Sequence, residues 1–457
     1  MHTKSPIDKL LRPFSDVRAG EGARALGMLA SLLVFMIAYY LLKTVRESLI
    51  LSTGGAEVKS YAAGLQALVL MAFVPAYGWL TRRVGRRGLI VGLTGFFFVN
   101  LQAFYVGLRL GAPFVGVAFF VWVGIFSLSV VAQFWSVAND LYSQGEGERL
   151  FPIIAFGATL GSPIGARAAE ALFERGVAPQ TMLQLAAALL VAHGALTLWL
   201  ARARSSSSAV AAVADRPLAG ASGGFQLIAR NPYLRLVALL LVLLNVVNTV
   251  GEYLLSKNAV AAAAAAVASG HAANRAAFLG SFYGSFFFWV NVTAALLQAL
   301  VVSRLVKRFG VRGVIAFLPI VAFGVYGALA LGASFTVVRL MKTAENASDY
   351  SVMNTGRAML WLPTTREEKY RAKQAMDTFF VRIGDVLATA IVFGAVSLLR
   401  LGPGALAAVN TALAIGWFAI ASLVARRHRA LSTAAAPRAI AGPVRAPARP
   451  ALAAAAR

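Results

Sequence analysis

The sequence predicts an all-α polytopic membrane protein with about 12 transmembrane helices in two six-helix halves. Three observations support this prediction. Of the 457 residues, 59% are hydrophobic and 13% are charged, a composition far from that of a soluble domain. Apolar runs recur along the chain and reach about 20 residues, which is long enough to cross the hydrocarbon layer as helices. A short motif also occurs once in each half, first at Gly78 and again at Ser303.

The chain divides into five segments. A basic segment, residues 1–24, precedes the first half, residues 25–200. A Ser-, Ala- and Gly-rich linker that ends in a short interfacial helix covers residues 201–235 and leads into the second half, residues 236–425. Residues 426–457 are rich in Ala, Pro and Arg and are expected to form a disordered cytoplasmic tail. The expected spans begin at about Ala25, Glu57, Leu89, Pro113, Leu150, Thr181, Leu236, Phe278, Val314, Ser334, Ala375 and Ala405.

The net charge of +25 is better explained by membrane topology than by nucleic-acid binding. The basic residues form short clusters between apolar runs, such as TRRVGRRG and SRLVKRFGVRG, and such clusters hold a loop in the cytoplasm. The expected outer loops hold only Lys59, Arg109, Arg175, Lys257, Arg275 and Arg400. This bias requires the polar stretch from Arg339 to Leu362 to cross the membrane. Both termini are then expected to be cytoplasmic, with the lipid bilayer as a partner and no nucleic acid.

Several chemistries are not supported by the sequence. The chain has no cysteine and no GxxxxGK[ST] phosphate loop, and His193 and His271 have no nearby metal-ligand partner. It also lacks a paired nucleophile and base and a soluble catalytic domain. We therefore expect a transporter without cofactor or metal. A membrane enzyme and a non-transporting sensor are the alternatives from other classes.

The polar stretch in the second half carries the densest charge within an expected span. Lys342, Glu345 and Asp349 follow i, i+3, i+7 spacing and share one helix face, with Asn346 and Tyr350 beside it. A charge in mid-bilayer is costly unless it faces protein or a water-filled cavity. These residues are therefore candidates for substrate binding or gating, and internally neutralised ion pairs that hold helix packing are the alternative.

Four other spans carry polar stripes. Asn245, Asn248 and Glu252 follow helical spacing in the seventh span, as do Gln133, Ser136 and Asp140 in the fourth. The first span holds Lys43, Arg46 and Glu47, in which Lys43 is expected to pair with Glu47 at i, i+4. In the eleventh span Arg382 and Asp385 are expected to pair at i, i+3, and a structural role for that pair is as well supported as a functional one.

The internal repeat favours one membrane architecture. GWLTRRVGRR, from Gly78, pairs with SRLVKRFGVR, from Ser303, and each follows the second span of its half; YYLLK and EYLLSK form a second match. Two six-span halves joined by a long cytoplasmic linker are the parallel-repeat design of the major facilitator superfamily. GWLTRRVGRR also resembles that superfamily's loop pattern, Gly-x-Leu-x-Asp-x-x-Gly-Arg-Lys/Arg, with Arg82 in place of the Asp.

Three further stretches resemble the ATP/ADP translocase family of plastids and intracellular bacteria. They are LLKTVRESLILSTGGAEV in the first span, FWSVAND with ERLFPIIAFGA around Asn139, and DYSVMNTGRAMLWLP, which Lys373, Asp377, Arg382 and Gly384 continue. The resemblance implies nucleotide exchange by alternating access in a bacterial inner (plasma) membrane. It also implies that Lys43, Arg46, Lys342 and Arg382 are the cations facing phosphates.

Two positions depart from that family's pattern. Asp349 stands where the family has Lys before Tyr-Ser, and Asp385 stands where it has Lys after Arg-x-Gly. Charges in near contact interact by about 4 kcal/mol at an effective dielectric constant of about 20, so both changes oppose a bound phosphate. The alternative is a proton-coupled carrier of a non-nucleotide metabolite, with Asp349, Glu345 or Glu252 carrying the proton.

Overall fold

The computed structural model describes residues 6–11, 15–202 and 223–440. Within these ranges every regular element is a helix, and η marks a π-helical segment. The first half contains α1 (Pro6–Leu11), α2 (Gly22–Thr53), α3 (Gly55–Thr81), α4 (Arg86–Arg109), α5 (Val115–Leu141), α6 (Gln144–Glu174) and α7 (Pro179–Arg202).

The second half begins with α8 (Gly224–Arg230), at the place where the sequence predicts a short helix. It continues with α9 (Pro232–Ala268), α10 (Arg275–Leu297), η1 (Gln298–Val302), α11 (Ser303–Ala330), α12 (Phe335–Ser348), η2 (Asp349–Met353), α13 (Asn354–Met359), η3 (Glu368–Ala372), α14 (Lys373–Ala375), η4 (Met376–Phe380), α15 (Val381–Phe393), η5 (Gly394–Leu398) and α16 (Pro403–Ile440).

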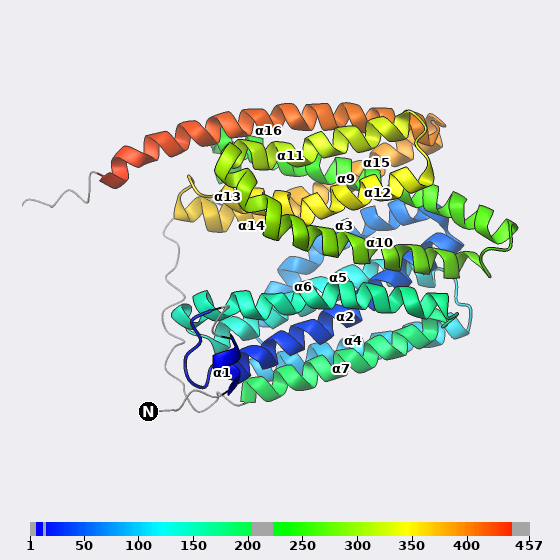
Figure 1. Cartoon of the computed structure of the whole chain (residues 1–457), viewed down its shortest axis with the longest axis horizontal. Helices are drawn as coiled ribbons and strands as arrows, with labels where there is room; N and C mark the ends of the chain where they lie inside the picture. Colours follow the sequence, from blue (N-terminus) through cyan, green and yellow to red (C-terminus); the bar gives the residue numbers. More distant parts are fainter. Residues whose placement is uncertain (1–5, 12–14, 203–222, 441–457) are drawn as a thin grey trace, which may run out of the picture.

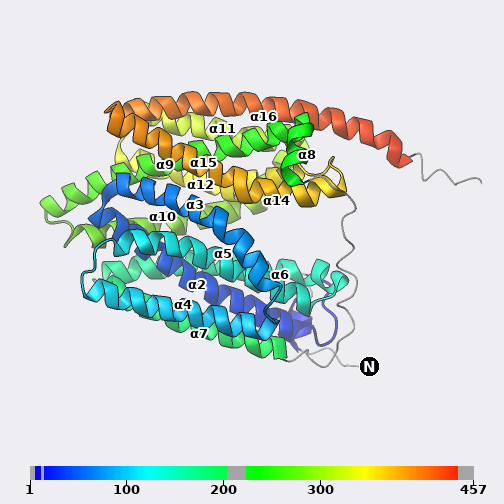
Figure 2. The ribbon, with the colours of Figure 1, turned by 180° about the vertical axis from the view of Figure 1, so that it is seen from behind.

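The helices form two bundles that lie side by side with their axes nearly parallel (Figures 1 and 2). Buried apolar side chains form a large cluster in each bundle. The bundles meet along two helix pairs related by the repeat, because α3 packs along α15 and α10 packs along α6. Glycines allow the second contact: a Cβ at Gly284 of α10 would lie 2.7 Å from the backbone nitrogen of Glu170 in α6.

The expected twelve crossings are present. Ten segments are long and apolar enough to span a membrane, and the longest, Arg275–Ala330, contains two crossings. Gly310 separates its two legs with a backbone conformation (φ 60°, ψ −157°) that glycine adopts without strain. The twelfth crossing is α12–η2–α13, which the apolar criterion misses because of its charges. The all-α fold with two six-helix halves is therefore confirmed.

Two local expectations are corrected. SRLVKRFGVRG, expected to be a loop, is helical on both sides of Gly310. Helix α16 continues to Ile440, so the expected disorder is wrong for residues 426–440, where the Ala-rich sequence favours helix. Residues 203–222 of the linker and 441–457 of the tail lie outside the described residues, and their predicted character stays a prediction.

Candidate functional site

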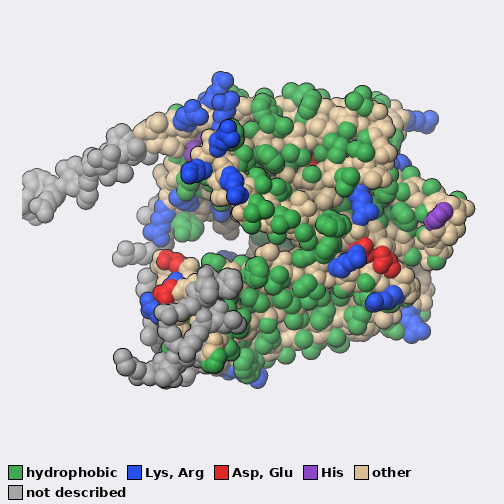
Figure 3. Space-filling model, viewed as in Figure 1, with side chains coloured by type: hydrophobic (Ala, Val, Ile, Leu, Met, Phe, Trp, Pro, Cys, Tyr) green, Lys and Arg blue, Asp and Glu red, His purple; other side chains and the backbone are tan. Residues whose placement is uncertain are grey.

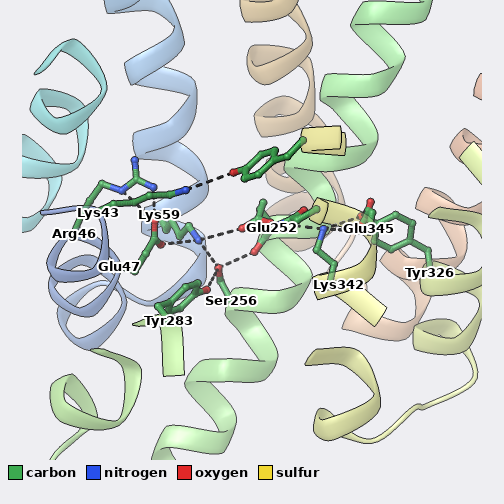
Figure 4. A network of polar contacts seen from close by, with 12 residues as sticks. Lys43, Arg46, Glu47, Lys59, Glu252, Ser256, Tyr283, Tyr326, Lys342 and Glu345 are labelled. Carbon is green, nitrogen blue, oxygen red and sulfur yellow. Dashed lines mark hydrogen bonds and ion pairs between the residues drawn. The ribbon is translucent and has the colours of Figure 1, made fainter. Parts of the chain in front are cut away.

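A chain of alternating charges crosses from the first half to the second (Figure 4). It starts on α2, where Arg46 forms an ion pair with the buried Glu47. Lys59 of α3 lies 2.8 Å from the second oxygen of Glu47. The same Lys59 Nζ lies 3.9 Å from Glu252 of α9, which belongs to the other half.

The charges continue inside the second half. Lys342 of α12 lies 3.7 Å from Glu252 and 2.5 Å from Glu345. Tyr326 of α11 donates a hydrogen bond to Glu345 at 2.6 Å, and Asn346 donates to Glu252 at 3.0 Å. The side chains of Lys342 and Glu345 are 0% and 4% exposed. We call Arg46, Glu47, Lys59, Glu252, Lys342 and Glu345 the ion network.

The ion network balances three cations against three carboxylates. Buried charges lose solvation, and mutual pairing with added hydrogen bonds is what offsets that loss. The structure thus brings together six predicted residues from α2, α9 and α12, namely Arg46, Glu47, Glu252, Lys342, Glu345 and Asn346. Lys59 was not predicted as a site residue, because the charge pattern placed it in an outer loop. In the structure it is buried near the start of α3. Its position two residues after Glu57, at the start of a span, is the signal that could have identified it.

Further contacts join the two halves at the same end of the bundle. Lys257 of α9 lies 2.5 Å from Glu57 of α3, and Tyr253 donates to the same carboxylate at 3.0 Å. Ser48 of α2 donates to the carbonyl of Ala276 in α10 at 2.7 Å. These elements lie beside the loops that join α2 to α3 and α9 to α10, so this end of the interface is closed.

Lys43 is not paired as predicted. Its expected partner Glu47 is occupied by Arg46 and Lys59. Instead the Lys43 ammonium lies 4.1 Å from the ring centroid of Phe287 and 5.1 Å from that of Tyr40, and it donates to the Tyr350 hydroxyl at 3.5 Å. Among the described residues no carboxylate lies within ion-pair distance of it. Lys43 is therefore a cation held mainly by aromatic faces.

The remaining predicted residues of the second half lie on α15, at the start of η2 and on α9. The Arg382–Asp385 pair is confirmed at 3.2 Å, and Thr249 of α9 donates to Asp385 at 3.0 Å. Asp349 begins η2, and its Oδ1 is buried without a hydrogen-bond partner in the described part of the chain. Asn248 is half-buried on α9, one turn before Glu252.

Asn139 and Asp140 lie at the opposite end of the bundle and do not join the ion network. Asp140 pairs with Arg86 of α4 at 3.2 Å. Asn139 lines a cleft of about 940 Å³ at the junction of α5 and α6, with Tyr370 of η3 contributed by the second half. The cleft is also lined by Trp135, Tyr142, Ser143, Gln144, Gly147, Glu148, Phe151, Pro152 and Ala155. The molecule is hollowed between its halves at this end, where the N-terminus lies (Figures 1 and 3).

The N-terminal segment packs against the same end of the first half. Arg149 of α6 donates two hydrogen bonds to Glu21, both at 2.9 Å, and Ser15 donates to the Arg149 carbonyl at 2.5 Å. The hydrogen bond from Arg149 lowers the pKa of Glu21 below its usual range. Asp8 accepts hydrogen bonds from the backbone of Gly20 and Gly22.

No sequence family and no curated protein matches this chain. Solved structures resemble it over nearly its whole length. The nucleoside transporter NupG has a TM-score of 0.63 at 12% identity, covering 87% of this chain and 98% of that one. A POT family transporter in complex with 5-aminolevulinic acid has a TM-score of 0.61 at 12% identity, covering 89% and 96%. A bacterial homologue of the iron transporter ferroportin in an inward-facing state has a TM-score of 0.59 at 15% identity, covering 87% and 98%.

These structures share a major-facilitator-like fold with the chain. At such low identities the likeness is one of fold. The fold predicted from the repeat is therefore confirmed, whereas membership of the ATP/ADP translocase family stays a prediction.

Proposed function

We propose that the chain is a secondary transporter that works by alternating access between its two halves. The ion network and the Glu57–Lys257 pair seal one end of the path, and the cleft around Asn139 is its open mouth. In this proposal the open mouth faces the cytoplasm of a bacterial inner membrane, as do both termini, in agreement with the basic clusters. Transport requires the Lys59–Glu252 contact to break when the opposite end closes.

The proposed cargo is an anionic nucleotide, exchanged in the manner of an ATP:ADP antiporter. The single observation that carries this proposal is Lys43, a cation without a carboxylate partner among the described residues, which lies among the rings of Tyr40, Phe287 and Tyr350. A phosphate pairs with an ammonium, and a base stacks on an aromatic face. The lining of the cleft supports the same cargo, because Trp135 and Phe151 offer rings and Asn139 an amide that can pair with a base edge.

A second candidate is a proton-coupled carrier of a non-nucleotide metabolite. Asp349 supports it, since its Oδ1 is buried without a hydrogen-bond partner among the described residues. A carboxyl group in such a place is suited to exchange a proton during the transport cycle. The internal pairing of Lys342 and Arg382 also leaves fewer cations for a polyphosphate.

Uptake into proteoliposomes separates the two candidates. With ADP inside, labelled ATP is expected to enter, and Lys43→Gln is expected to lower the rate at least about tenfold, since one charged contact is worth about 1.5–3 kcal/mol. Arg275→Gln is the matched control, because it removes one charge from an exposed position at the closed end. Its rate is expected to stay within about twofold of the unaltered protein.

Two results would decide against nucleotides. One is the absence of ATP uptake together with no thermal stabilisation by ATP or ADP at millimolar concentration. The other is equal uptake by the Lys43→Gln and unaltered proteins. Uptake of another metabolite that is driven by a proton gradient and lost in Asp349→Asn would instead establish the second candidate.

A further inference from the structure

An apolar groove lies on the outer surface of the first half, away from the interface between the halves. It has a volume of about 490 Å³ and lies between the last turns of α3 and the first turns of α4. Its walls include Phe73, Tyr77, Trp79 and Phe96. Gly92 leaves room for it, since a Cβ there would meet no atom within 4 Å. The groove is open towards the bilayer and is not filled by the described part of the chain.

The mouth of the groove is strongly basic. The turn between α3 and α4 carries Arg82, Arg83, Arg86 and Arg87. The Arg83 guanidinium lies 4.0 Å from the ring centroid of Trp79, a wall of the groove, and Arg86 pairs with Asp140. Arg83 is exposed and forms no ion pair within the described residues. Arg82, by contrast, lines a separate pocket together with Phe225 of the second half. The groove therefore has an apolar interior with uncompensated positive charge at its mouth.

We propose that this groove binds one anionic phospholipid, with an acyl chain between α3 and α4 and the phosphate on Arg83. An acyl chain suits an apolar groove that faces hydrocarbon. Basic side chains at headgroup level attract anionic lipids, and a Trp at that level anchors the interface.

The internal repeat provides a natural control. In its register Lys307 and Arg308 of the second half stand at the positions of Arg82 and Arg83. The position of Gly92, however, is taken by Phe317, which packs beside Val314 and Val352. The second half thus carries the same charges at its turn but has a bulky side chain where the groove has none.

Native mass spectrometry of the purified full-length protein tests the proposal, with phosphatidylglycerol and phosphatidylcholine as the two probes. One phosphatidylglycerol is expected to bind with clear preference. Arg83→Gln should weaken its binding about fivefold. Arg308→Gln, at the matching position of the second half, removes the same charge and should change the binding less than about twofold.

A second pair of variants tests the groove itself. Gly92→Leu fills it, and Gly95→Leu adds the same side chain at an exposed site of α4 that does not line the groove. Only Gly92→Leu is expected to abolish the tightly bound lipid. Equal losses in Arg83→Gln and Arg308→Gln would overturn the proposal in favour of general attraction to the membrane surface. So would equal binding of the two lipids, or unchanged binding in a folded Gly92→Leu.

Discussion

The two ends of the bundle hold their charges differently. At the closed end, charged contacts join the halves: Lys59 reaches Glu252, and Lys257 reaches Glu57. At the open end, the ion pairs of Glu21 with Arg149 and of Arg86 with Asp140 stay within the first half. In the second half, the ion pair of Glu367 with Arg371 likewise stays within that half. Charge therefore links the two halves where they are closed and stabilises each half separately where they are open.

The distances within the ion network show a second difference. The anchoring pairs are short, 2.8 Å for Lys59–Glu47 and 2.5 Å for Lys342–Glu345. Within the ion network, the contact that crosses between the halves, Lys59–Glu252, is long at 3.9 Å, and the Glu252 side chain is 28% exposed. A contact that must break in each cycle is expected to be weaker than the pairs that keep its charges neutral when it is broken. The anchors should therefore govern stability and the crossing contact should govern conformation.

The largest effect is expected from breaking an anchor. Lys342→Met leaves Glu345 buried with only the Tyr326 hydroxyl, and should lower the free energy of unfolding by about 3–5 kcal/mol. Thermal unfolding of the purified protein measures the loss. The double variant Lys342→Met/Glu345→Met replaces both charges by apolar groups and should recover most of it. A double variant no more stable than Lys342→Met would contradict the assignment of this pair as an anchor.

The crossing contact should act on conformation instead. Lys59→Met removes the link to Glu252 and the 2.8 Å hydrogen bond that Lys59 donates to Ser256 of α9, but it leaves Glu47 paired with Arg46. The closed end should therefore open more often. Because the chain has no cysteine, Ser48→Cys provides a single label at a fully buried site between α2 and α10. Its labelling rate is expected to rise about tenfold in Lys59→Met, an effect of about 1.4 kcal/mol. An unchanged rate would show that the crossing contact does not hold this end closed.

Much of this fold could be predicted from the sequence because its signals are local. Apolar runs long enough to cross a membrane predicted eleven crossings. The bias of basic residues towards the cytoplasmic loops predicted the twelfth, α12–η2–α13. The i, i+3 pairs Lys342–Glu345 and Arg382–Asp385 were predictable for the same reason, since helical spacing alone brings their side chains together.

The candidate site was less predictable, because its partners come from different helices. Lys43 was expected to pair with Glu47 from spacing, but Lys59 of the next helix competes for that carboxylate. Spacing along one helix cannot predict that a residue of another helix will take the same carboxylate. Asp140 was grouped with the membrane charges by helical spacing, and Asn139 was included through the family resemblance. The depth of α5 in the bundle places both residues at the other end. Depth and partner choice depend on tertiary packing, which a single sequence does not contain.

A smaller effect is expected at the open end. Glu21→Gln removes the charge that accepts two hydrogen bonds from Arg149, and should ease opening of the N-terminal segment by about 1 kcal/mol. The folded-state pKa of Glu21 is lowered, so its stabilising effect is present above the unfolded value of about 4.3 and is lost as the pH falls through the folded value. Hydrogen exchange of residues 15–24, compared at equal pH, should therefore differ between the two proteins at pH 7 and converge in acid.

That prediction tests whether contacts of the open end are local. Exchange at the closed end, around Ser48, is expected to be the same in Glu21→Gln and the unaltered protein at every pH. A change at both ends would contradict the separation of the two regions, because it would mean that the N-terminal segment is coupled to the ion network.

The smallest effect is expected for the other link between the halves. The side chains of Lys257 and Glu57 are 42% and 30% exposed, and exposed pairs contribute about 0.2–1 kcal/mol and are screened by salt. Lys257→Gln should therefore raise the labelling rate of Ser48→Cys less than about fivefold at low salt, and hardly at all at about 1 M salt. Lys59→Met should keep its larger effect at both salt concentrations, because the Lys59 ammonium is buried and its hydrogen bond to Ser256 is shielded from salt. Should Lys257→Gln match Lys59→Met at high salt, burial would not be what distinguishes the two links, and the peripheral pair would have to be counted as part of the seal.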